Sequence, residues 1–353
     1  MAAVGRAFAR RRLGTVIAAV VLALAQAGCR PAAPAAEATL VSETRLAMGA
    51  TLTLSVWTAD TAAARQSIAA AFAEADRLEG LLSVWRDGSD VVRLNAAAGG
   101  SAISVAAETR TVLGAAAEAS RLTEGKFDVT FGSLSDLWRF DHDQDDRIPD
   151  RQAIAARLPL VDHTAVVVDP SAGTARITRP GVRVHLGGIG KGFAVDRLAA
   201  RLRDDGFDDF LIQSGGDLYA AGRRGDRPWR VGLQDPRGEA GDTFATIDLT
   251  DETFSTSGDY ERFFERDGVR YHHLIDPDTG QPARGCRSVT IVAADAMTAD
   301  WLSTGVFILG PDRGLALVER LPGVEAVIVT DDNTVRVSSG LTSRLTLQRP
   351  PTP

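Results

Sequence analysis

Residues 183–193 read RVHLGGIGKGF, a β-rich run that ends in a glycine-rich turn and leads into a helix. Further β-rich runs follow, and several are joined by short turns rather than by helices. This order favours an α+β fold over a doubly wound sheet, in which a helix would separate successive strands. The β-rich runs are 166–168, 183–186, 210–213, 229–233, 246–249, 288–292 and 326–329, and helices are predicted at 193–203, 298–307 and 311–320.

The residues before this segment predict one strand and three helices. Residues 46–57 alternate between apolar and polar side chains, as a strand does, whereas residues 62–82 have apolar side chains at helical spacing. A second helix is predicted at 108–123, and Pro149-Asp150 starts a short third one. We expect one folded body over residues 41–348.

The first residues have the features of an export signal. Arginines at 6 and 10–12 precede an apolar run at 13–25, which is shorter than the roughly 20 residues of a membrane span. Residues 1–28 are therefore predicted to be a signal peptide. The small residues before Cys29 are typical of bacterial lipoproteins, so Cys29 is the predicted lipid anchor and the Pro- and Ala-rich residues 29–40 a tether.

This anchor would hold the protein on the periplasmic face of a bacterial membrane. Ordinary cleavage near Ala27 is the alternative, because Gln26 stands where a lipobox usually has an apolar residue. Without residues 1–28 the formal charge is −11, which argues against a nucleic-acid partner. Cys286 is the second of two cysteines, so a lipidated Cys29 leaves no internal disulfide.

The composition, 44% hydrophobic and 24% charged, is that of a globular protein with a sizeable core. Within it, residues 186–193 are the sharpest chemical signal. Backbone amides at a glycine turn approach an anion closely, the helix start adds positive potential, and Lys191 adds a charge suited to phosphate. The spacing is not that of a P-loop, and a purely structural turn is an equally good interpretation.

Two further clusters combine small polar residues with histidines. Residues 213–217, QSGGD, stand at a strand end, where two glycines admit a ligand or make a tight turn. Residues 255–260, STSGDY, precede His272 and His273, which point to opposite faces of a strand, so at most one faces a site. Five histidines without a usable cysteine ligand argue against zinc.

Residues 141–152 have alternating aspartates, as a calcium loop does. Asp146 stands at the position that requires glycine, and Gln152 at the position of the usual glutamate. A solvated loop is therefore predicted.

Asp300 and Thr304 lie four residues apart at a predicted helix start, so a carboxylate and a hydroxyl share one helix face. Hard oxygen ligands of this kind suit Mg²⁺, which takes the rest of its shell from water and substrate phosphates. Taken alone, the pair is explained better by an N-terminal aspartate that interacts with the helix dipole.

Together these segments resemble the ApbE family, the FAD:protein FMN transferases, over nearly the whole chain after the signal peptide. The motifs stand in the family's order. They are Met48-Gly49, residues 82–85 (LSVW) with Ser89 and 93–95 (RLN), 123–130 (TEGKFDVT), 187–196, 215–217, 256–260, 273–280 and 299–304.

The resemblance implies a T-fold-like α+β architecture, with mixed and antiparallel sheets and packed helices. It also implies FAD as substrate, Mg²⁺ as cofactor, and an acceptor flavoprotein whose threonine or serine receives FMN. By position, the metal ligands would be Asp300, Thr304 and the backbone carbonyl of Gly188. The FAD site would be lined by Met48, Trp85, Lys126, Phe127, Asp128, Lys191 and His273. His273 or Asp300 would take the proton of the attacking hydroxyl.

The chain departs from the family's pattern at two positions. His185 stands where an aspartate usually precedes Leu-Gly-Gly, and Lys126 replaces a small residue before Phe-Asp. Two other functions fit the same motifs. An FAD diphosphatase would release free FMN and AMP, and a periplasmic flavin-binding lipoprotein would hold FAD without turnover.

Overall fold

The computed structural model describes residues 37–140 and 143–353. The predicted signal peptide, Cys29 and residues 29–36 of the predicted tether lie outside the described residues, as do residues 141–142 of the acidic loop. In the described part of the chain, no helix combines the length and apolarity needed to cross a membrane.

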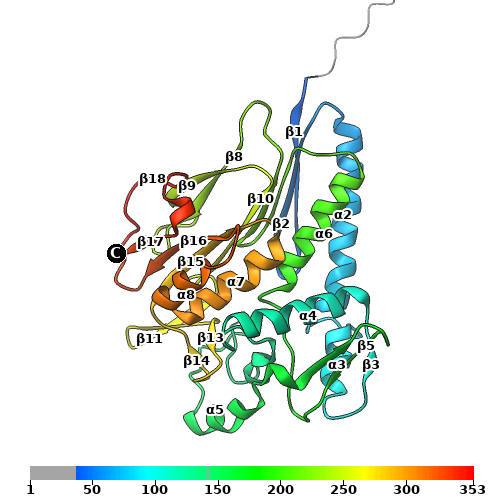
Figure 1. Cartoon of the computed structure of the whole chain (residues 1–353), viewed down its shortest axis with the longest axis vertical. Helices are drawn as coiled ribbons and strands as arrows, with labels where there is room; N and C mark the ends of the chain where they lie inside the picture. The colour runs from blue at the N-terminus through cyan, green and yellow to red at the C-terminus, as the bar shows by residue number, and fades with distance from the viewer. Residues whose placement is uncertain (1–36, 141–142) are drawn as a thin grey trace, which may run out of the picture. The chain divides into compact units, whose positions relative to one another are not determined.

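An antiparallel eight-stranded sheet forms the centre of the fold (Figure 1). Its strand order is β1-β2-β6-β7-β10-β15-β16-β17. The strands are β1 (Thr39–Ala47), β2 (Ala50–Thr58), β6 (Phe210–Ser214), β7 (Asp217–Ala221), β10 (Glu252–Gly258), β15 (Cys286–Ala293), β16 (Glu325–Thr330) and β17 (Val335–Val337).

Helices cover one face of this sheet and a second sheet covers part of the other. The alternation along β7 shows the division, because Tyr219 packs with the helices and Leu218 with the second sheet. In Figure 1, α2 and α6 run side by side along the helical layer. The helices are α2 (Thr61–Leu82), α6 (Gly190–Asp204), α7 (Ala296–Leu309) and α8 (Pro311–Val318), and the second sheet has β8 (Trp229–Gln234), β9 (Thr243–Leu249) and β18 (Thr346–Leu347).

Shorter elements complete the fold around the large sheet and its helices. A three-stranded sheet packs with α4, and two small hairpins follow β10. These elements are α3 (Asp90–Ala96), β3 (Ile103–Ser104), α4 (Ala107–Leu122), η1 (Val129–Leu134), α5 (Arg151–Arg157), η2 (Leu158–Leu160), η3 (His163–Ala165), β4 (Val166–Asp169), β5 (Thr174–Ile177), β11 (Phe263–Arg266), β12 (Val269–His272), β13 (Ile275–Asp276), β14 (Gln281–Pro282) and η4 (Ser339–Leu341).

The α+β prediction is confirmed, but two predicted strands are wrong. The strand expected at residues 46–57 is two strands joined by a two-residue turn at Met48-Gly49, whose φ angles of 55° and 70° fit a tight hairpin. The body also begins earlier than expected, with β1 starting at Thr39 rather than Val41.

Residues 183–186 form no strand although their side chains are β-rich. The side-chain amide of Asn95 takes the place of a neighbouring strand, since its Oδ1 accepts from Val184 N at 2.7 Å and its Nδ2 donates to Val184 O at 2.9 Å. His185 N donates to Val129 O at 2.8 Å. The backbone is thus satisfied one residue at a time rather than by a ladder.

Candidate active site

A cavity of about 890 Å³ opens between the β1–β2 turn, the glycine turn before α6, the end of β10 and helix α7. The structure brings all of the residues predicted for the site to this cavity. Its lining includes Met48, Trp85, Lys126, Phe127, Asp128, Gly188, Lys191, His273, Asp300 and Thr304. Segments that are far apart in the sequence therefore share one surface.

The glycine turn places Lys191 in the first turn of α6, which begins at Gly190. The turn closes where Gly190 N donates to Leu186 O at 2.8 Å. Gly188 lies against α7, because a Cβ at this position would be 3.5 Å from Thr304 Oγ1. The turn therefore lies beside Thr304, with room for little more than a methyl group between them.

Lys191 is held between two buried carboxylates. Its Nζ lies 3.1 Å from Asp217 Oδ2 and 3.3 Å from Asp300 Oδ1. Burial alone would lower the pKa of Lys191, but the two carboxylates raise it, so the ammonium stays charged. Burial, with repulsion from Asp217, raises the pKa of Asp300 above its ordinary value.

Hydroxyl groups link Thr304 to Asp217. Ser257 Oγ lies 3.0 Å from Thr304 Oγ1 and 2.8 Å from Ser303 Oγ. Ser303 Oγ is 3.3 Å from Ser255 Oγ, which donates to Asp217 Oδ1. This chain fixes the Thr304 hydroxyl at the cavity wall.

The oxygen atoms at this wall are of the chemical type that magnesium prefers as ligands. Asp300 and Thr304 supply a carboxylate and a hydroxyl beside Gly188, and Asp217 Oδ2, paired with Lys191, is buried at the same wall. With one lysine between two carboxylates, the wall carries a net negative charge when all three are ionised. Among residues 37–140 and 143–353, no group of three or more His, Cys, Asp or Glu side chains is placed to hold a metal. The site would therefore need oxygen atoms of the substrate.

The predicted flavin-side residues line the same cavity. Phe127 is buried and packs edge-on against Trp301, with ring centroids 6.3 Å apart. Trp85 is 55% exposed, so it presents an aromatic face at the cavity wall. Asp128 accepts from Thr130 N at 2.7 Å and from His163 N at 2.9 Å, which gives it a structural task as well.

Lys126, one of the two departures from the family pattern, forms ion pairs within the wall. Its Nζ donates to Asp276 Oδ1 and Asp278 Oδ2, both at 2.7 Å. Burial opposes its charge, but the two carboxylates raise the pKa of Lys126. It therefore ties the 276–278 turn to the Phe127 segment.

The second departure, His185, also lines the cavity. Its Nδ1 accepts from Gly187 N at 3.1 Å, and its ring centroid lies 5.4 Å from that of Phe131. The imidazole thus contributes to the shape of the glycine turn.

The two adjacent histidines differ in environment. His272 is buried, and its Nε2 bonds to Ala283 O at 3.0 Å. His273 lines the cavity, and its Nδ1 is buried without a partner. Burial lowers the pKa of His273 to about 3, so its ring is neutral at physiological pH.

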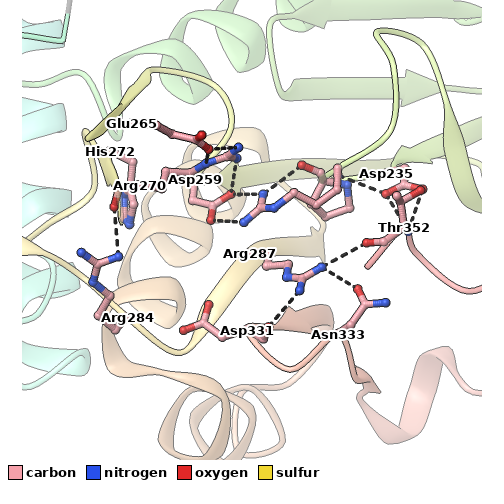
Figure 2. Close-up of polar contacts among 12 residues, drawn as sticks. Asp235, Asp259, Glu265, Arg270, His272, Arg284, Arg287, Asp331, Asn333 and Thr352 are labelled. Carbon is pink, nitrogen blue, oxygen red and sulfur yellow. Dashed lines mark hydrogen bonds and ion pairs between the residues drawn. The ribbon is translucent and has the colours of Figure 1, made fainter. Parts of the chain in front are cut away.

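A network of ion pairs supports the β11–β12 hairpin, which ends at His272 (Figure 2). Asp259 accepts two hydrogen bonds from Arg237, each 2.7 Å long, and lies 3.5 Å from Arg270 Nη1. Arg270 also donates to Glu265 at 2.8 Å and stacks 4.0 Å above the ring of Phe263, which lines the cavity. Asp259 belongs to the motif at residues 255–260, but the sequence pattern did not indicate that Arg237 and Arg270 would pair with it.

Comparison with known proteins gives the family. The model of the ApbE family matches residues 48–328. The chain belongs to the ApbE family. A relative from Treponema pallidum, named FAD:protein FMN transferase, is 36% identical over 282 residues, which are 76% of this chain and 78% of the relative. A Klebsiella pneumoniae protein of the same name is 31% identical over 83% of this chain and 90% of its own length.

Solved ApbE structures have the same fold. The ApbE protein of Thermotoga maritima matches with a TM-score of 0.80 and 32% identity over 87% of this chain and 99% of its own. The flavin transferase ApbE from Vibrio cholerae matches with a TM-score of 0.77 and 29% identity over the same shares. The expected ApbE-like architecture is thereby confirmed.

Proposed function

We propose that this ApbE-family chain is an FAD:protein FMN transferase that attaches FMN to a threonine or serine of an exported flavoprotein and releases AMP. The observation that carries the proposal is the meeting of Lys191 and the glycine turn with Asp300 and Thr304 across one cavity. A cation, the positive N-terminus of a helix and hard oxygen ligands together are what a diphosphate requires. Relatives with this name support the same conclusion.

The reaction replaces the phosphoanhydride bond between FMN and AMP with a phosphoester bond between FMN and the acceptor. The acceptor hydroxyl attacks the FMN-side phosphorus, the bond to the AMP oxygen breaks, and the hydroxyl proton passes to the protein. Asp300, Thr304 and the Gly188 carbonyl would hold Mg²⁺, and charge neutralisation at the diphosphate oxygens is the chemistry that the ion supplies. Lys191 and the positive N-terminus of α6 stabilise the negative charge that develops on these oxygens.

Of the two candidate proton acceptors, we choose His273. Its ring is neutral and its Nδ1 has no partner, whereas Asp300 Oδ2 already accepts from Gly192 N at 2.9 Å. The neutral imidazole has a lone pair for the hydroxyl proton, and the negative charge of a bound diphosphate raises the pKa that burial has lowered. His273 also lines the same cavity as Asp300.

Mass spectrometry of a candidate acceptor after incubation with the protein, FAD and Mg²⁺ separates the three functions. Transfer adds the mass of FMN to the acceptor and gives AMP. An FAD diphosphatase would give free FMN and AMP with an unmodified acceptor, and a binding protein would leave FAD intact. Either of the last two results would overturn the proposal.

Asp300→Ala tests the metal pair. We expect AMP release at saturating FAD to fall by a factor of about 100 or more, because the variant loses both a metal ligand and the counter-charge of Lys191. Asp312→Ala is the control, since Asp312 lies on α8 with an 84% exposed side chain. Near-normal turnover of Asp300→Ala with Mg²⁺ would remove Asp300 from the mechanism.

A further inference from the structure

Asp196 lies on α6, six residues after the start of that helix, and its carboxylate reaches across to α7. Its Oδ1 accepts from Ala296 N at 2.7 Å and its Oδ2 accepts from Met297 N at 2.9 Å. These are the first two backbone N–H groups of α7, which have no partner within their own helix. Each oxygen of one carboxylate is thus bound to a different amide of the neighbouring helix.

Helix α7 has a cap of its own. Asp295, the residue before the helix, accepts from Thr298 N at 2.8 Å. The start of α7 is therefore capped locally, as in most helices. Asp196 adds a contact between helices, which fixes where α7 begins relative to α6.

A second contact runs in the reverse direction. Gly192 N, in the first turn of α6, donates to Asp300 Oδ2 on α7 at 2.9 Å. The helices approach so closely that a Cβ on Gly192 would lie 2.2 Å from Ala296 O. A carboxylate from each helix therefore holds the first turn of the other.

This reciprocal arrangement decides which way Asp300 points. Because its Oδ2 is bound to α6, its Oδ1 is the oxygen that faces Lys191 at 3.3 Å. Asp300 lies four residues after Ala296, about one helical turn, so a rotation of the first turn of α7 carries Asp300 with it. A wrong rotation would move Oδ1 away from the cavity.

We propose that Asp196 is a positioning residue whose carboxylate fixes the rotation of α7 and thereby directs Asp300 Oδ1 and Thr304 toward the diphosphate. This role rests on the proposed function of the same site. Asp196 itself forms no ion pair among the described residues, and burial raises its pKa to about 6, so the carboxylate is kept at some cost in stability. Residues that orient metal ligands typically change metal affinity or activity by about 10- to 100-fold when they are replaced.

The test compares Asp196→Asn with Asp295→Asn. An asparagine at 196 keeps the size of the side chain but has only one acceptor oxygen, so its NH₂ group faces a backbone N–H. FAD affinity is measured by flavin fluorescence with Mg²⁺ and with EDTA, together with kcat for FMN transfer and the melting temperature. We expect Asp196→Asn to lose the Mg²⁺-dependent gain in FAD affinity and to lower kcat about 10- to 100-fold, with FAD affinity in EDTA changed less than about twofold.

Asp295→Asn alters the same helix start without the contact to α6, so we expect wild-type values for Mg²⁺-dependent affinity and kcat. An Asp196→Asn protein that changes only in melting temperature would overturn the proposal, as would an equal loss in Asp295→Asn. If Asp196→Asn does not fold, Asp196→Ser is used. If neither variant folds, the carboxylate has a purely structural role and the proposal is overturned. Wild-type protein without any Mg²⁺-dependent gain would instead overturn the proposed function.

Discussion

His272 offers a test of burial at the scale of one residue. Its side chain is 2% exposed, and burial lowers its pKa to about 4. In the unfolded chain the pKa is about 6.5. Above this pH the ring is neutral in both states, and its contribution to stability is fully present. As the pH falls from 6.5 to 4, only the unfolded chain takes up the proton, so stability is lost.

We therefore expect the free energy of unfolding to contain a term from His272 that is about 2 kcal/mol smaller at pH 5 than at pH 7. His272→Gln removes the titration while keeping a side chain that can donate to Ala283 O. Urea unfolding of both proteins at the two pH values measures the difference. An equal pH dependence in wild type and His272→Gln would show that His272 is not buried as a neutral ring.

At this scale the sequence predicted identities better than contacts. Asp300 and Thr304 could be paired from their helical spacing. Lys191 could be predicted as a phosphate-binding residue from its place after the glycines. The ion pair between Lys191 and Asp217 could not be predicted. Asp217 lies on a strand, and its distance from Lys191 depends on the order of strands in the sheet. Nor could Asn95 be expected to replace a strand beside Val184, because the two are 89 residues apart.

At the scale of elements, the crossing of α6 and α7 requires glycine at 192. A Cβ there would lie 2.2 Å from Ala296 O and 2.7 Å from Asp300 Cβ, so the helices would have to separate. We expect Gly192→Ala to lose about 1–3 kcal/mol of stability and most FMN transfer, because Asp300 would move with α7.

Gly80→Ala is the matched control for that substitution. Gly80 is an exposed position inside α2, and a Cβ there meets nothing within 4 Å. Since alanine is the better helix former, this variant should gain about 0.5–1 kcal/mol and keep its activity. Urea unfolding and the mass assay measure both effects. A Gly192→Ala protein with wild-type stability would contradict the close helix crossing.

The β11–β12 hairpin is the second element whose placement bears on the cavity. Arg270 on this hairpin contacts Asp259 and Glu265 (Figure 2). Its guanidinium also stacks over the ring of Phe263. Arg270→Met keeps the length of the side chain but removes the charge, while Arg237 still neutralises Asp259. The variant loses about 1 kcal/mol of cation–π interaction energy that holds the Phe263 ring in place. This loss should raise the KM for FAD about fivefold, with a smaller change in kcat.

Arg230→Met tests whether any lost arginine has this effect. Arg230 also pairs with a carboxylate across two strands, Asp248 at 2.8 Å, but its side chain is 72% exposed. Such surface pairs contribute about 0–1 kcal/mol, so we expect an unchanged KM. Steady-state kinetics of the two variants decide the matter, and equal KM values for Arg270→Met and wild type would remove the hairpin from FAD binding.

At the scale of the whole molecule, strand-to-strand turns were enough to predict an α+β fold. Periodicity located the long helices within a few residues, since each has one face against the sheet. It failed where local chemistry replaced a ladder, at residues 183–186, and where a short turn was hidden in a continuous β-rich run, at Met48-Gly49. The meeting of these segments in one cavity follows from topology, which the family resemblance implied and the local patterns did not.

The predicted location of the whole protein rests on Cys29. We propose that the chain is exported and lipid-anchored there, because small residues precede this cysteine at the end of an apolar run. Stable anchoring takes at least two acyl chains, so without the cysteine the protein should leave the membrane. Cys29→Ser is therefore expected in the soluble periplasmic fraction, with its FMN transfer retained.

Cys286→Ser is the control for that experiment, because Cys286 is the other cysteine of the chain and its thiol is buried. We expect it to stay in the membrane fraction, as we expect of wild type. Fractionation, with an intact mass that reports the lipid on the first residue, distinguishes anchoring from simple secretion. Cys29→Ser that still sediments with membranes, or wild type cleaved near Ala27 without lipid, would show that the protein is exported by the signal peptide but not anchored by Cys29.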